Sequence, residues 1–215
     1  MTVAIAAGNR HELRRLIEER LKDSRPPTDP HTAVPAGFSA EVDAAVRQYF
    51  PAAPAAAAVL VPLVDHEDGL TVLLTQRASH LKNHAGQISF PGGRIESSDE
   101  GALAAALRET QEEIGLSREY ITIAGYLEPH LVLSGFWVTP VVGFVQPGFA
   151  LQLDRREVDA TFEVPLLHIL DSANHKARER TLGTTQVRVY DIPYREYHIW
   201  GATAGMLMSL YKLLK

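Results

Sequence analysis

The 215-residue chain contains no cysteine, which excludes disulfide bonds, thiolate catalysis and zinc–thiolate sites. No apolar stretch approaches the roughly 18 residues of a membrane span, because the alanine-rich run 52–60 is short and Pro54 interrupts it. A formal net charge of −5 argues against broad nucleic-acid binding, which needs a basic surface. The first residues also lack the pattern of a signal peptide. We therefore expect a cytoplasmic protein that binds neither membrane nor nucleic acid.

Apolar residues make up 46% of the chain, enough for one full hydrophobic core. We expect a helical extension over residues 1–50, which packs on a main domain over residues 51–215 or at a homodimer interface. Asn9 is a good cap for its first helix. Residues 24–38 hold four prolines and read as a linker, and Ser39 is the candidate cap of a second helix.

Strands follow this extension. The continuous apolar run 57–64 predicts a buried strand, and residues 65–69 form a turn to a returning strand over 70–76. Further strands are expected over 121–127, 138–145 and 186–192. A closing helix is indicated by Leu207, Leu210, Tyr211 and Leu214. The pattern predicts an α/β protein, a mixed β-sheet sandwiched between α-helices.

The most informative segment carries Arg108, Glu109, Glu112 and Glu113 on one predicted helix that Gly115 ends. Three carboxylates on one helical turn repel each other, and a hard divalent cation such as Mg²⁺ or Mn²⁺ would neutralise that repulsion.

Helical periodicity orients these carboxylates. Leu103, Leu107, Thr110 and Ile114 form the expected core stripe, and the three glutamates are expected to point away from it. A solvated acidic face remains the alternative.

The segment resembles the signature of the Nudix hydrolases, because R-E-x-x-E-E-x-G follows the Gly92-Gly93 turn. The resemblance implies a mixed sheet between helices, and metal-dependent cleavage of a diphosphate in a nucleotide derivative. Thr110 stands where an aliphatic residue is usual. One extra residue lies between glycine and helix, so Asp99 or Glu100 replaces the first glutamate.

This longer spacing is similar to that of the Nudix subgroup that hydrolyses coenzyme A. That subgroup also has an upstream motif, which residues 73–93 match closely, with Lys82 where arginine is commoner. Further similarity covers 134–143, 162–166 and 199–204. The resemblance implies cleavage of coenzyme A, or a derivative, into 3′,5′-ADP and 4′-phosphopantetheine.

Site residues can be assigned from these motifs. Glu109, Glu113 and Glu112 are the expected ligands of Mg²⁺ or Mn²⁺. The resemblance gives Arg108 the task of aiming these carboxylates. The general base is left open between three glutamates, Glu112, Glu157 and Glu163.

Substrate contacts are expected upstream of the helix. Arg77 and Lys82 are candidates for gripping phosphates, and Gly92 and Gly93 allow close approach of the backbone. Each cation has a solvated surface position as its alternative.

Two other functions stay open. The first is a Nudix hydrolase of ADP-ribose, dinucleotides or nucleoside triphosphates. The second is a domain that binds a nucleotide without catalysis and regulates a partner. The second is disfavoured because all the helix carboxylates are present.

Overall fold

The computed structural model describes residues 9–26, 28, 34–35, 37–38, 46, 48–50 and 52–215. Most of the predicted helix beginning at Ser39 and about half of the linker lie outside these residues. The helices are α1 Arg10–Leu21, α3 Ala102–Ile114, α4 Leu166–Leu170 and α5 Gly201–Leu214, with 3₁₀ turns η2 Arg118–Tyr120 and η3 Ser172–Asn174. In the described part of the chain, no helix is long and apolar enough to cross a membrane.

The strands form a nine-stranded mixed sheet and a separate three-stranded sheet. The large sheet contains β1 Val34–Pro35, β2 Ala55–His66, β3 Gly69–Arg77, β4 Ile88–Ser89, β5 Gly92–Arg94, β6 Ile121–Tyr126, β7 His130–Leu131, β8 Phe136–Val145 and β9 Val158–Pro165. The small sheet contains β10 Lys176–Leu182, β11 Thr185–Tyr194 and β12 Tyr197–Trp200.

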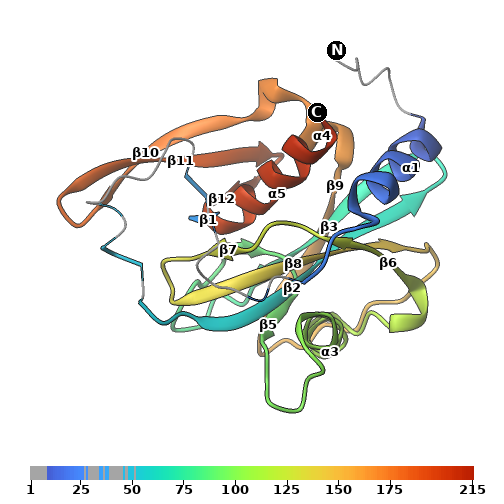
Figure 1. Ribbon diagram of the computed structural model, residues 1–215, viewed down its shortest axis with the longest axis horizontal. Helices are drawn as coiled ribbons and strands as arrows, with labels where there is room; N and C mark the ends of the chain where they lie inside the picture. The colour runs from blue at the N-terminus through green and yellow to red at the C-terminus, as the bar shows by residue number, and fades with distance from the viewer. Residues whose placement is uncertain are drawn as a thin grey trace.

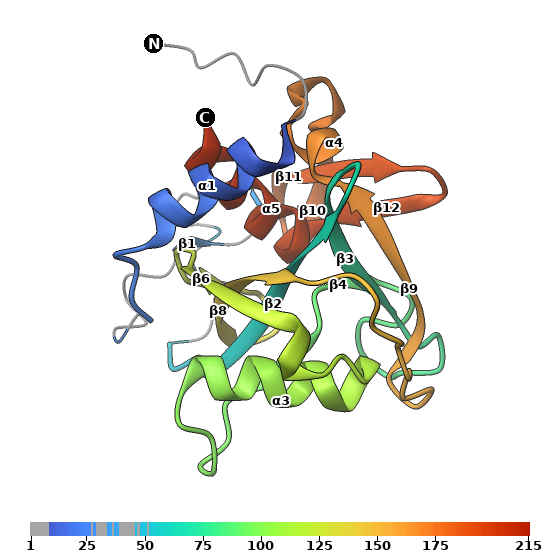
Figure 2. The ribbon, with the colours of Figure 1, turned by 90° about the vertical axis from the view of Figure 1, so that its right-hand side faces the viewer.

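β2 is the central strand of the large sheet. It pairs in parallel with β8 and antiparallel with β3 and β5, while β6 adds to β8 and β9 to β3. Figure 2 shows α3 on one face of this sheet, and α1, α5 and the small sheet on the other. The predicted sandwich of a mixed sheet between helices is therefore confirmed, as is the hairpin of β2 and β3.

Both faces of β2 are covered, which explains its unbroken apolar sequence. Leu60 and Val64 are buried in the cluster under α3, whereas Val61 and Leu63 belong to the cluster under α1 and α5. A strand that is buried on both sides needs no alternation of polar and apolar residues.

α1 begins at its predicted cap, where the Asn9 side chain accepts a hydrogen bond from the His11 N–H. The helix buries Leu13, Ile17 and Leu21 against β6, α5 and β3. The domain boundary at residue 50 and the homodimer stay predictions.

The predicted core stripe of α3 is confirmed at Thr110 and Ile114, which are fully buried, but the face that meets the sheet is rotated from the predicted one by part of a turn. The helix turns its small residues to the sheet, where Ala105 and Ala106 are fully buried, while Leu103 and Leu107 are only partly buried at the flanks. Alanine lets the helix axis lie close to the sheet, so the longer leucine side chains fit better beside the contact than within it. The rotation also brings Glu113 to the buried side of the helix.

Candidate active site

Several sequence segments form three walls around one cavity of about 640 Å³ on the large sheet. The end of β3 and the loop after it supply one wall, β5 and α3 a second, and the β7–β8 connection with the start of α5 a third. The lining includes Arg77, His84, Gln87, Ile88, Gly92, Gly93, Arg94, Glu109, Glu113, Val132, Leu133, Phe136, Glu157, Trp200, Ala202 and Met206.

Glu113 is the most deeply placed carboxylate of the cavity, with 4% of the residue exposed. The Gly92 N–H donates a hydrogen bond to its Oε2 at 3.2 Å, and Arg77 Nη1 lies 3.8 Å from its Oε1. Burial raises the pKa of Glu113 to about 8, and the nearby Glu157 and Glu109 carboxylates add to that rise. A cation in the cavity would favour the charged form of this group instead.

Glu109 lies directly against the glycine turn. A Cβ on Gly93 would stand 2.5 Å from the Glu109 carboxyl carbon, and one on Gly92 would stand 2.3 Å from the Ala58 carbonyl oxygen. Gly92 also has a φ of +152°, which side chains disfavour. The two glycines therefore let the backbone approach the carboxylates closely. Burial raises the pKa of Glu109, and the Arg108 contact opposes that rise.

Arg108 holds this arrangement together from outside the cavity. Its Nε and Nη2 donate to Asp99 at 3.0 and 2.9 Å, and its Nη1 donates to Glu109 at 3.0 Å and to Glu112 at 3.1 Å. Nη2 also donates to the Arg94 carbonyl oxygen. Asp99 and Glu100 were the two candidates to replace the first glutamate of the signature. Of these, Asp99 is the residue whose carboxylate accepts both hydrogen bonds from Arg108.

The remaining predicted residues divide into two groups. Arg77 and Glu157 line the cavity, whereas Lys82 is exposed and Glu112, with 60% of its side chain exposed, stays outside the lining. The candidate base Glu163 lies in a strand, although the sequence favoured a loop for it and for Glu157. It belongs to β9, where His66 Nε2 contacts its carboxylate at 2.6 Å.

Some lining residues were not singled out in the sequence. Arg94, Phe136 and Trp200 face the cavity, although Phe136 and Trp200 lie in the segments 134–143 and 199–204 that carry the resemblance. No periodic pattern marks them, because each stands at the end of a strand or beside a turn.

The donor set suits a hard divalent cation. Glu109 and Glu113 offer oxygen atoms only, and Glu157 lies near enough to raise the pKa of both. Mg²⁺ and Mn²⁺ prefer such ligands. Within the described part of the chain, no three histidine or acidic side chains already form a group that could hold a metal ion.

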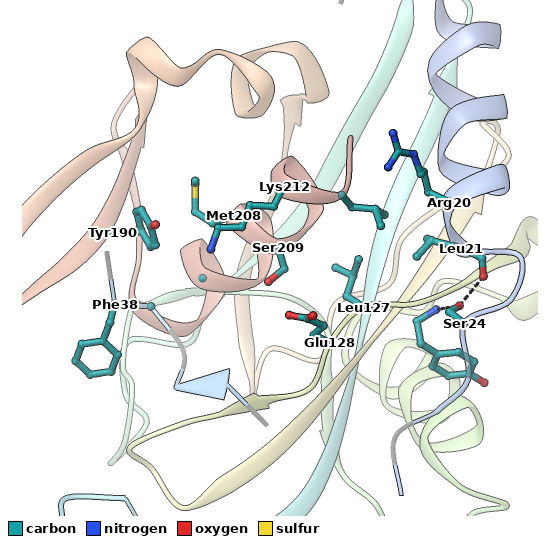
Figure 3. A pocket seen from close by; sticks show the side chains of 14 residues that line it. Arg20, Leu21, Ser24, Phe38, Leu127, Glu128, Tyr190, Met208, Ser209 and Lys212 are labelled. Atoms are coloured by element: carbon teal, nitrogen blue, oxygen red, sulfur yellow. Dashed lines mark hydrogen bonds between the residues drawn. The ribbon is translucent and has the colours of Figure 1, made fainter. Parts of the chain in front are cut away.

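A second cavity, of about 510 Å³, lies between α1, the residues before β7 and the middle of α5 (Figure 3). Its charged lining residues are Arg20, Glu128 and Lys212, all of them exposed. None of the glutamates on α3 reaches it, so it is separate from the candidate active site.

Comparison with known proteins identifies the class. A family model of the NUDIX domain matches residues 54–184, so the chain belongs to the Nudix family and is a hydrolase of phosphoanhydride bonds, acting on a diphosphate substrate. The predicted family and enzyme class are confirmed.

Among its relatives is an uncharacterised Nudix hydrolase named NudL from Enterobacter sp., 43% identical over 155 residues, which are 72% of this chain and 80% of the relative. A protein of the same name from Salmonella paratyphi B is 42% identical over the same shares. A solved Ap4A hydrolase complex from C. elegans is 24% identical, with a TM-score of 0.45, over 52% of this chain and 80% of that one.

Proposed function

We propose that this Nudix hydrolase cleaves the diphosphate of coenzyme A or a coenzyme A derivative, releasing 3′,5′-ADP and 4′-phosphopantetheine or its acyl form. The observation that carries the proposal is that the upstream motif and the Nudix helix line the same cavity. The upstream motif supplies Arg77, His84 and Gln87 to the same cavity that receives Glu109 and Glu113 from the Nudix helix. This convergence supports a substrate-binding role for the motif that resembles the coenzyme A subgroup.

The cavity lining combines two kinds of side chain. Glu109, Glu113 and Glu157 supply carboxylates near the glycine turn, whereas Val132, Leu133 and Met206 supply apolar surface. Coenzyme A combines a diphosphate with a long arm of amides and methylenes. The apolar part of the cavity suits that arm, and the acidic part suits a metal-bound diphosphate.

Glu109 and Glu113 are the first proposed ligands of Mg²⁺ or Mn²⁺, and Glu112, bonded to the same guanidinium as Glu109, is the third. The cation would supply positive charge to the diphosphate oxygens, where negative charge grows in the transition state. Arg108 fixes the direction of the carboxylates through its contact with Asp99.

Among the three candidate bases, we propose Glu157 as the group that takes the proton of the attacking water. It is the candidate that lines the cavity. Glu112 is directed to Arg108, and Glu163 is engaged with His66 on β9.

Arg77 is the proposed phosphate contact of the upstream motif. It lines the cavity with 26% of its side chain exposed, so its guanidinium can meet a ligand. Lys82, the other cation of that motif, is proposed with it as a contact at the rim.

The test is an incubation of the purified protein with Mg²⁺ or Mn²⁺ and a substrate panel, followed by chromatographic separation of the products. The panel contains coenzyme A, dephospho-coenzyme A, ADP-ribose, NADH and dATP. Preferred turnover of coenzyme A to 3′,5′-ADP supports the proposal. Preference for ADP-ribose, NADH or dATP overturns the substrate assignment, and binding without turnover of any of them would indicate a regulator.

A further inference from the structure

Two aromatic side chains face the cavity at the ends of different strands. Phe136 opens β8 and Trp200 closes β12, and both are partly buried. Phe136 is paired with Ala55, three residues along β2 from Ala58, the partner of Gly93. At about 3.3 Å per residue, the ring stands roughly 10 Å along the strand from the glycine turn.

Each ring has an arginine over one face. The Arg180 guanidinium carbon lies 5.0 Å from the Trp200 ring centroid, and that of Arg94 lies 5.8 Å from the Phe136 centroid. Cation–π contacts at such distances hold a ring in place. Arg180 comes from the hairpin of β10 and β11, which extends beside α5 in Figure 1. The indole is thus oriented before any ligand arrives, which lowers the entropic cost of binding.

The position of Trp200 is unfavourable for the fold. It is the N-cap of α5, where no side-chain capping hydrogen bond forms. Ser, Thr, Asp or Asn at an N-cap normally stabilises a helix, and an indole has no acceptor to offer. Gly201, next in the chain, has a φ of +61° and turns the strand sharply into the helix. A large aromatic residue at this turn is better explained by a ligand than by packing.

Trp137, the other tryptophan of the chain, lies in a different environment from Trp200. It does not line the cavity, and its Nε1 atom is buried. Because it lies outside the cavity lining, it offers an internal comparison for Trp200.

We infer that Trp200 is a substrate-binding residue that stacks on the purine base of the nucleotide half, with Phe136 on the same apolar wall. A flat purine matches the face of an indole, whereas the pantetheine arm has no flat π-system to stack. The inference rests on the proposed function only in requiring an adenine nucleotide substrate, so it also applies if the preferred substrate is ADP-ribose.

The chain has two tryptophans, so Trp137→Phe leaves Trp200 as the single tryptophan emitter. This variant is titrated with 3′,5′-ADP, AMP and 4′-phosphopantetheine, with excitation at the red edge of tryptophan absorption, where adenine is transparent. We expect saturable quenching by both nucleotides and little change with 4′-phosphopantetheine. An equal or larger response to 4′-phosphopantetheine, or no response to the nucleotides, overturns the inference.

Kinetics give a second readout. Base–aromatic stacking predicts that Trp200→Ala raises the KM of the preferred nucleotide substrate roughly 5- to 150-fold, with kcat changed less than about threefold. Trp200→Phe should recover most of the loss. An unchanged KM in Trp200→Ala overturns the inference, and the titration remains valid if that variant does not fold. A different preferred substrate in the panel would refute the coenzyme A assignment while leaving this test intact.

Discussion

Replacing Glu113 by glutamine should raise the stability of the metal-free protein and lower its activity, because the buried carboxylate destabilises the fold at neutral pH but is the proposed metal ligand. In the folded protein burial raises the pKa of Glu113 from 4.5 to about 8. The folded state therefore binds more protons than the unfolded state between these two pH values, so the wild-type protein loses stability as pH rises through that window. Glutamine carries no charge, so the variant should lack this loss.

The magnitude follows from the shift. Each pH unit between 4.5 and 7 costs about 1.4 kcal/mol, because Glu113 is ionised in the unfolded chain and must take up a proton when the protein folds, so the metal-free protein loses about 3 kcal/mol of stability by neutral pH. Glutamine can still accept from the Gly92 N–H, but it buries an amide, so we expect a net gain on the order of 1–3 kcal/mol. In a protein of this size that corresponds to roughly 2–12 °C in Tm.

The assay is thermal unfolding in the presence of a chelator, at about pH 5 and about pH 8. The advantage of Glu113→Gln over wild type should be small at the lower pH and largest at the higher. Glu112→Gln is the matched control, since that side chain is 60% exposed and its replacement should change stability by less than about 0.5 kcal/mol. With Mn²⁺ added, wild type should gain stability and the variant much less, and turnover should fall on the order of 100-fold. A variant less stable than wild type at pH 8 in chelator would refute the reasoning.

Three further predictions follow from the site and the core. Arg77→Ala should raise the KM for coenzyme A about 10- to 100-fold, and more than replacement of the exposed Lys82 by alanine does. If the KM for coenzyme A rises more than that for dephospho-coenzyme A, Arg77 contacts the 3′-phosphate. If both KM values rise equally, it contacts the diphosphate. Burial, with a smaller effect of Lys212, lowers the pKa of His130 from 6.5 to about 4, so His130→Gln should remove an acid-side loss on the order of 3 kcal/mol between these pH values, measured by denaturant unfolding. Ala106→Asp should unfold the protein, whereas Leu107→Asp at the partly buried flank should be milder, as circular dichroism melting would show; equal effects would contradict the observed face of α3.

The sequence was sufficient to predict those strands whose burial leaves a clear pattern of apolar residues. β2 and β3 were predicted because a continuous apolar run and a turn at Gly69 are local signals, which do not depend on how the rest of the chain packs. β9 was missed because its residues are mostly half-buried, so that neither an unbroken apolar run nor a clean alternation marks it. The small sheet was found only at β11, since β10 has almost no buried side chain.

The site was predictable in its residue types but not in its geometry. Helical periodicity correctly places Glu109 and Glu113 on one side of α3. It does not show whether the alanine face or the leucine face of the helix packs on the sheet, because both faces are apolar. Leucine has more apolar surface to bury, whereas alanine permits closer approach of backbone to backbone, and here the close approach wins. That choice has a consequence for function. Because Ala105 and Ala106 bring α3 against β2, Glu109 comes within van der Waals reach of the Gly93 position, and Glu113 within hydrogen-bond reach of the Gly92 N–H. A helix held off the sheet by leucines would leave these carboxylates in solvent, with ordinary pKa values and weaker attraction for a metal. The alanines of α3 thus determine where the two carboxylates lie, although nothing in the chemistry of alanine marks them as part of a site.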